Sequence, residues 1–360
     1  MTEKEMLIID EAIAELGGIM DVSPGQRVKD LVKSALGRSV RTRDPMFWPA
    51  GMLMLGLSEA GRRAASEGSD DMTAKIDRAV LDHMRLWKEK YGRKISYIDD
   101  ALAGVAFVRL HERTEDEKLR SELREAADKI YKYLQEAARD PEGTIVYNAD
   151  RSLSNVFADG IGQTAMFLSA YARAFGVTDA AKLARVQLAN FMKHGMDDRS
   201  GLPYHGYALA KDGTCEKRGV LSWGRAAGWL IMGLSEYVKG SDETQAEENA
   251  GIIDWYHGLS KALLTYQKSE GGYGWQGQAV DGHTDTSATG MIVYGLLNGG
   301  GAAAGEVEAS LKALLNSTEG GKVVSALSSC DDFGVHYQTY GNYPWGQGAA
   351  LAAISLGAED

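Results

Sequence analysis

The sequence lacks the features that would link it to a disulfide-stapled, nucleic-acid-binding or membrane-spanning protein. It has only two cysteines, Cys215 and Cys330, too far apart for a metal-type pair and too few for a disulfide framework. A net charge of −11 argues against the basic face that a nucleic-acid binder needs. No apolar run approaches the roughly 18 residues of a membrane span. Acidic residues near the N-terminus stand where a signal peptide has basic ones. These absences predict a cytoplasmic protein with no nucleic-acid or membrane partner.

Proline is also scarce, with 6 residues, whereas glycine is abundant, with 43. Many glycines and few prolines are typical of numerous helices that are joined by tight turns. Hydrophobic residues make up 44% and charged residues 25% of the chain, as in ordinary globular proteins. At 360 residues the chain is long enough to bury a large core.

Six apolar segments rich in Ala, Gly, Leu and Met recur at intervals of about 60 residues. In the third, which runs from Gly160 to Phe175, Ile161, Ala165 and Leu168 are spaced as on one helix. Each segment is apolar around most of its circumference, which predicts a helix that is buried on nearly all sides. The six segments begin after Trp48, Asp99, Asp159, Trp223, Asp285 and Trp345.

More polar stretches with a single apolar stripe alternate with these segments, and they predict surface helices. The clearest is Glu117–Gln135, where Leu119, Leu123 and Ile130 fall on one face among charged residues. The other such stretches are Met1–Val40, Asp70–Tyr91, Asp179–His194, Glu243–Lys268 and Glu306–Ser317.

An alternation of six buried and six amphipathic helices predicts an all-α (α/α)6 barrel, a double toroid of six helical hairpins that forms a single catalytic domain over residues 1–360. An open solenoid is the competing architecture. A solenoid would have solvent-facing helices at its ends, whereas here the first and last buried segments are as apolar as the others. The pattern therefore favours a closed ring.

In a closed ring all six buried helices begin at the same end, so the residues that precede them would line one site. Helix N-termini carry unpaired N–H groups and a partial positive charge, which favours an anionic ligand. Tryptophan and carboxylate together are typical of a sugar site, since aromatic rings stack on sugars and carboxylates move protons.

Two of these positions carry the candidate catalytic carboxylates. Asp159 is either a helix cap or a catalytic group, because Asp is a favoured capping residue. Of the neighbours Asp99 and Asp100, we expect Asp100 to cap its helix and Asp99 to face the site. Carboxylates that lie close together push their pKa values apart, which leaves one able to hold a proton near neutral pH.

The candidate binding residues come from the other helix starts and one loop. Trp48 is either an aromatic cap or a stacking platform, Trp345 is a candidate substrate-binding residue, and Asp285 is either a cap or a hydroxyl-binding group. His205 lies in a loop between two tyrosines and two glycines, which favours a ligand contact. Arg225, near a helix N-terminus, opposes the helix dipole, so it is either a clamp for a carboxylate or an ion-pair partner of Asp99 or Asp285.

Three motifs in this order resemble glycoside hydrolase family 105, the unsaturated rhamnogalacturonyl hydrolases. They are Phe157-Ala-Asp-Gly160, Gly201-Leu-Pro-Tyr-His-Gly206 and Trp223-Gly-Arg-Ala-Ala-Gly-Trp229. The resemblance continues through Thr286–Met291 and Trp345–Ala349, and so covers most of the chain from Trp48 onward. The family fold is the (α/α)6 barrel, which the repeat pattern predicts separately.

The resemblance implies removal of a 4,5-unsaturated uronic acid from the non-reducing end of an oligosaccharide that a polysaccharide lyase has produced. The reaction hydrates the C4=C5 enol ether, and the resulting hemiketal opens and releases the neighbouring sugar. By similarity, Asp159 is the general acid and Asp99 assists it. Further by similarity, the substrate-binding residues are His205, Trp223, Arg225 and Trp229. The resemblance implies neither a metal nor another cofactor, and we expect a monomer or a weak homo-oligomer.

The sequence departs from the family pattern at two places. Tyr147-Asn148-Ala149-Asp150 stands where rhamnogalacturonyl hydrolases have a His and a Lys, which puts a rhamnose leaving group in doubt. The related unsaturated glucuronyl hydrolases of family 88 have a His-Asp pair where this chain has Ile98-Asp99, so the sequence predicts a protein outside that group.

Two alternatives remain on sequence grounds. The first is an (α/α)6 hydrolase that cleaves an ordinary glycosidic bond with Asp99 and Asp159 as its acid and base. The second is a helical ring that binds carbohydrate without catalysis.

Overall fold

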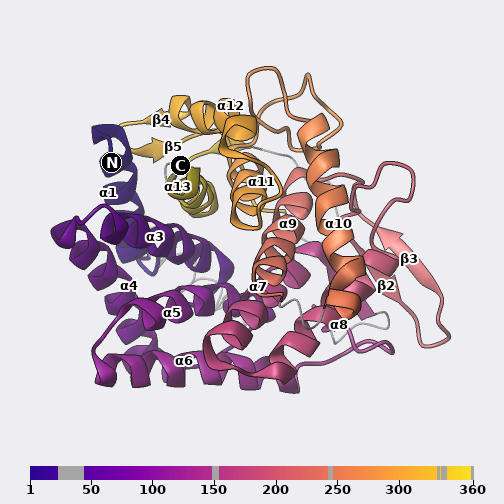
Figure 1. The fold of residues 1–360 in the computed structure, drawn as a ribbon, viewed down its shortest axis with the longest axis horizontal. Coiled ribbons are helices and arrows are strands. Elements are labelled where there is room, and N and C mark those ends of the chain that lie inside the picture. Colours follow the sequence, from indigo (N-terminus) through magenta and orange to yellow (C-terminus); the bar gives the residue numbers. More distant parts are fainter. Residues whose placement is uncertain (23–43, 148–153, 242–245, 331–332, 334–338, 358–360) are drawn as a thin grey trace, which may run out of the picture.

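Six inner helices form a closed ring in the computed structural model, which describes residues 1–22, 44–147, 154–241, 246–330, 333 and 339–357 (Figure 1). Each inner helix packs against the next, and the last packs against the first. The inner helices are α3 (Trp48–Ser66), α5 (Ala101–Arg113), α7 (Ala158–Phe175), α9 (Gly224–Lys239), α11 (Thr286–Asn298) and α13 (Pro344–Gly357). The fold is therefore an (α/α)6 barrel, as the sequence predicts.

Outer helices cover the inner ring, each packed on the inner helix that precedes it in the chain. These are α4 (Asp70–Tyr91), α6 (Glu117–Glu136), α8 (Thr178–His194), α10 (Ala246–Thr265) and α12 (Ala304–Asn316). The sixth outer helix is α1 (Glu3–Gly18), which packs on α13, so the two ends of the chain complete one hairpin. The predicted Met1–Val40 stretch is helical only to Gly18 in the part described, since residues 19–22 are not helical and residues 23–40 lie outside the described ranges.

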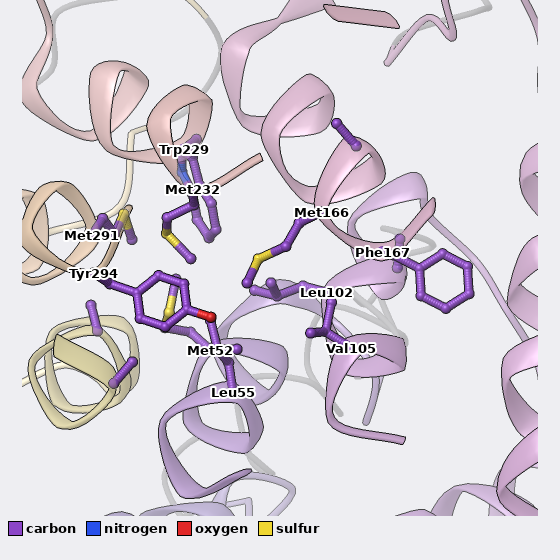
Figure 2. Packing of buried hydrophobic residues seen from close by; sticks show 14 of the residues in the cluster. Met52, Leu55, Leu102, Val105, Met166, Phe167, Trp229, Met232, Met291 and Tyr294 are labelled. Atoms are coloured by element: carbon purple, nitrogen blue, oxygen red, sulfur yellow. The ribbon is translucent and has the colours of Figure 1, made fainter. Parts of the chain in front are cut away.

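The centre of the barrel is filled by side chains from the inner helices (Figure 2). Met52, Leu102, Met166 and Met291 point toward one another from four different helices, and each is fully buried. Flexible methionine side chains fill the irregular space that straight helices leave at the axis of a ring. None of the helices in the described part of the chain is both long and apolar enough to cross a membrane.

Glycines let the inner helices approach one another at backbone distance. A Cβ atom on Gly56 would lie 2.4 Å from the carbonyl oxygen of Gly348, and a Cβ atom on Gly348 would lie 2.3 Å from that of Met52. These two glycines join α3 to α13 and so close the ring. On the other side of the barrel, a Cβ atom on Gly162 would lie 2.2 Å from the carbonyl oxygen of Trp229, between α7 and α9.

Short strands in the connections are the main feature that the sequence did not predict. They are β1 (Ser154–Phe157), β2 (Gly206–Leu209), β3 (Cys215–Arg218), β4 (Thr318–Glu319), β5 (Lys322–Val323), β6 (Ala326–Leu327) and β7 (Tyr340–Gly341). Antiparallel pairing joins β1, β2 and β3 into one sheet, and joins β4 to β5 and β6 to β7. Strands of two to four residues are too short to produce a recognisable alternation of apolar and polar residues.

Replacing Gly348 with Ala is expected to destabilise the protein by about 1–3 kcal/mol, because the new methyl group overlaps the α3 backbone. Gly258→Ala is the matched control, since Gly258 is exposed on α10 and a Cβ atom there meets nothing within 4 Å. The control is expected to stabilise the protein by roughly 0.5–1 kcal/mol. Denaturant unfolding measures both variants, and equal effects would contradict a ring closed at Gly348.

Candidate active site

Asp159 is the second residue of α7 and projects from the end of the barrel where the inner helices begin. Strand β1 runs directly into α7 and pairs with β2, with Phe157 opposite Gly206. This pairing places His205, the residue before β2, beside Asp159, with 3.3 Å between Nε2 and Oδ2. Phe157 occupies the N-cap position, and α7 has no side-chain cap. Asp159 is therefore not a helix cap, and its carboxylate is available for another use.

Asp99 lies in the 3₁₀ turn η1 (Ile98–Asp100), which leads into α5. The side chain is 1% exposed, and its Oδ2 atom accepts a hydrogen bond from the Tyr147 hydroxyl. Its Oδ1 atom is buried and has no hydrogen-bond partner among the residues that the structure describes. The neighbouring Asp100 accepts the backbone N–H groups of Ser96 and Tyr97 at 2.8 and 3.2 Å. Asp100 occupies the N-cap position of α5 as expected, but its side chain makes no capping hydrogen bond to that helix and binds the backbone that leads into η1 instead.

Burial raises the pKa of Asp99 from 3.8 to about 8. The hydrogen bond from Tyr147 acts against this rise, whereas the charges of Asp159 and Asp100 add to it. Asp99 thus holds a proton near neutral pH, and burial also raises the pKa of the neighbouring Asp100, to about 7. The side chain of Asp159 is 23% exposed, so water reaches it while Asp99 is shielded. The assignment of Asp159 as the acid rests on resemblance and stays a prediction.

An aromatic cluster lies at the same end of the barrel. The ring of Trp48, the first residue of α3, is 4.8 Å from that of Trp345 and 6.2 Å from that of Trp229. Tyr343 stacks on Trp345 with its centroid 4.6 Å away. Trp48 is only partly buried, whereas Trp229 is 1% exposed and extends toward the barrel core (Figure 2). The structure therefore leaves Trp48 accessible to a ligand and makes Trp229 chiefly a packing residue.

Arg225 lies between the aromatic cluster and the part of the site that holds Asp159 and His205. Its guanidinium lies 4.8 Å from the ring of Trp223 and 5.9 Å from that of Trp345. Trp223 in turn contacts His205, with ring centroids 4.1 Å apart. All eight residues that the sequence singled out for catalysis or substrate binding thus lie at one end of the barrel: Asp99, Asp159, Trp48, His205, Trp223, Arg225, Trp229 and Trp345.

The hydrogen bonds of Arg225 differ from the structural ion pair that was one of the two sequence-based alternatives. Nη1 donates to the carbonyl oxygen of Leu327 at 2.6 Å, and Nη2 donates to that of Ser328 at 2.9 Å. Within the described residues it forms no ion pair with Asp99 or Asp285. A guanidinium has five N–H donors, so donors remain for a ligand. Arg225 therefore holds the β6 segment in place and can still bind a carboxylate.

Asp285 is a helix cap, one of the two roles that the sequence left open. Its Oδ1 atom accepts the N–H and the hydroxyl of Ser287 at 2.9 and 2.6 Å and the N–H of Leu327 at 3.0 Å. The Leu327 carbonyl also accepts the indole N–H of Trp345 at 2.8 Å. The backbone of Leu327 is thus bound by three residues at the starts of inner helices: Asp285 accepts its N–H, and Arg225 and Trp345 donate to its carbonyl oxygen.

Sequence reasoning missed two contributors to this site, Tyr147 and the backbone of Leu327. Tyr147 lies in a loop and Leu327 in a two-residue strand, where no helical spacing connects them to the residues that they contact. Tyr147 appeared only as the first residue of a departure from the family pattern, and the rest of that departure, Asn148 to Asp150, lies outside the described residues. Over the described ranges, no three His, Cys, Asp or Glu side chains are grouped so that they could hold a metal ion.

The sequence model of Glycosyl Hydrolase Family 88 matches residues 25–356 of this chain. The sequence predicts a chain outside the family 88 group because Ile98, and not a His, precedes Asp99. That prediction does not hold at the level of the family, since the family model matches the chain despite Ile98. A single neighbouring side chain does not decide membership when the match spans nearly the whole barrel.

Solved structures with the same fold include a possible member of family GH105 from Salmonella enterica serovar Paratyphi A. It has 17% sequence identity and a TM-score of 0.75, over 99% of this chain and 94% of that one. An unsaturated glucuronyl hydrolase specific for heparin has 14% identity and a TM-score of 0.69, over 99% and 97%. The unsaturated glucuronyl hydrolase of Bacillus sp. GL1, responsible for the degradation of glycosaminoglycan, has 15% identity and a TM-score of 0.65, over 88% and 87%. At these identities the likeness shows the fold.

The variant Asp99→Asn is expected to be more stable than the native protein at pH 8 and about equally stable at pH 4. In the native protein the pKa of Asp99 is about 8 when folded and ordinary, near 3.8, when unfolded. The contribution of protonated Asp99 to the free energy of unfolding is therefore fully present below pH 4, and it is lost as the pH rises toward 8. Asn carries no charge at either pH. One pKa unit corresponds to about 1.4 kcal/mol, so the gain at pH 8 is on the order of a few kcal/mol. Denaturant unfolding at both pH values measures it, and a difference independent of pH would contradict the raised pKa.

Proposed function

The chain belongs to Glycosyl Hydrolase Family 88, and from this membership we propose that it removes a 4,5-unsaturated uronic acid from the non-reducing end of lyase-generated oligosaccharides. The protein is a glycoside hydrolase that acts on an oligosaccharide. The observation that carries the finer proposal is the carboxylate couple at the helix N-termini: a buried Asp99 with a raised pKa and a partly exposed Asp159 beside His205.

Hydration of an enol ether needs a proton at C4 and a hydroxyl group at C5. At neutral pH the Asp99/Asp159 couple holds one proton, because burial and the charge of Asp159 disfavour the ionisation of Asp99. In the proposed mechanism Asp159, the member that solvent reaches, delivers this proton to C4. Its carboxylate then takes a proton from the water that adds at C5. The hemiketal so formed opens, the bond to the neighbouring sugar breaks, and the proton count of the couple is restored.

The substrate's own carboxylate suits the remaining features of the site. Arg225 has N–H donors that the β6 carbonyl oxygens do not use, and six helix N-termini surround the site with partial positive charge. Trp48 is the accessible aromatic surface for a sugar ring. We further propose an unsaturated galacturonyl or glucuronyl unit linked to a sugar other than rhamnose. The cytoplasmic location and the monomeric or weakly associated state stay predictions.

Asp159→Asn is expected to lower the rate roughly 100- to 10,000-fold, because an amide cannot exchange the proton that general acid catalysis needs. The loss of ultraviolet absorbance of the conjugated unsaturated uronate, followed over a panel of lyase products, measures the rate. Asp198→Asn, in an exposed turn, is the control and should leave the rate unchanged. A fully active Asp159→Asn would refute the mechanism. A flat signal with native protein on every substrate would refute the proposed function, and mass analysis would then reveal any ordinary glycosidic cleavage.

The pH dependence gives a separate test of the couple. Because the couple must carry a proton, kcat/KM is expected to fall as the pH rises through about 8, the pKa of Asp99. The profile is measured with the absorbance assay between pH 5 and about 10, with the protein shown to stay folded throughout. A rate that stays constant well above pH 8 would mean that no proton of this couple is used.

A further inference from the structure

Tyr147 bridges the two chain segments that carry the candidate catalytic carboxylates. Its hydroxyl donates a hydrogen bond to Oδ2 of Asp99, on the η1 turn. Its backbone N–H donates to the carbonyl oxygen of Asn155 at 2.9 Å, on strand β1, which runs into α7 and Asp159. One residue is therefore bonded to both of the segments whose relative placement sets the separation of Asp99 and Asp159.

The aromatic ring of Tyr147 is held by packing against residues next to Asp159. It packs edge-on against Phe157, with ring centroids 5.0 Å apart, and Phe157 packs against His205 at 5.2 Å. A Cβ atom on Gly160 would lie 2.7 Å from Ile98 and 3.4 Å from the Tyr147 ring, so the glycine after Asp159 lets these groups close together. Packing thus leaves the Tyr147 hydroxyl little freedom to leave Asp99.

We propose that Tyr147 is a positioning residue for the hydration reaction, which holds Asp99 through Oδ2 so that the proton of the couple resides on Oδ1. This inference rests on the proposed function. The physical reason is that a hydroxyl donates preferentially to the unprotonated oxygen of a carboxyl group, which carries more negative charge. Oδ1, buried and without a partner in the described part of the chain, is then the oxygen that exchanges the proton with Asp159 or the ligand.

The groups around Asp99 determine how its titration responds to a change at Tyr147. Asp159 on α7 and the adjacent Asp100 both disfavour ionisation of Asp99, whereas the Tyr147 hydroxyl favours it. Tyr133 on α6 also lies near Asp99, and Asp44 and Lys94 act on Asp100. Among these neighbours Tyr147 donates the hydrogen bond that stabilises the ionised Asp99.

The test is Tyr147→Phe, which removes the hydroxyl and keeps the ring against Phe157. We expect kcat to fall about tenfold with little change in KM, and the alkaline limb of the pH profile to move up by about one pH unit, because the ionised Asp99 loses a charge-assisted hydrogen bond. Tyr133→Phe is the matched control. Its hydroxyl donates to the backbone carbonyl of Ser96 at 3.1 Å, so the pH limb should not move.

Two further measurements separate the outcomes. In an Asp99→Asn background, Tyr147→Phe should lower the rate no further if it acts through Asp99, and an additive loss would overturn the proposal. The carboxyl carbon of Asp99, followed by NMR, should titrate at higher pH in Tyr147→Phe than in the native protein, and an unchanged titration would overturn it too. This titration needs no substrate, so it remains decisive if native protein is inactive on every unsaturated oligosaccharide, an outcome that refutes only the proposed reaction.

Discussion

The glycine-mediated approach of the inner helices is the constraint on which the rest of the structure depends. Where Gly56 meets Gly348, the first and last inner helices come so close that any side chain would overlap the facing backbone. Helices at this distance can form a closed ring of six, and closure brings all their N-termini to one end. Asp99, Asp159 and Trp345 come from positions far apart in the chain, and they share one site only because the ring is closed.

Buried carboxyl groups have opposite electrostatic surroundings at the two ends of the barrel. Where the inner helices end, Glu236 is buried between Arg109 and Arg173, with oxygen-to-nitrogen distances of 2.7 and 2.6 Å. Burial disfavours the Glu236 charge, but the two arginines outweigh it and lower its pKa to about 2. Where the helices begin, Asp99 is equally buried, no cation pairs with it over the described ranges, and its pKa rises to about 8. The first arrangement stabilises a charge and suits a structural role, whereas the second keeps a proton available and suits catalysis.

Family membership and fold restrict the chemistry without choosing the substrate. Structures that resemble this chain include a possible GH105 member and glucuronyl hydrolases, at similar TM-scores and low identity. Ile98 and Tyr147 stand at the two places where the sequence departs from the family pattern, and both lie against Gly160, next to Asp159.

The sequence by itself determined the six buried and the amphipathic helices, their alternation and the positions at which the inner helices begin, because helical periodicity is local and depends on residues three and four apart. It also singled out Asp99 over Asp100 and placed His205 at the site. Only the tertiary structure decided that Asp285 caps its helix while Asp159 does not, that Arg225 holds the Leu327 carbonyl, and that Tyr147 binds Asp99. These contacts join loops to helices across long stretches of chain, and their geometry depends on how the closed ring brings the connections together, which no local pattern records.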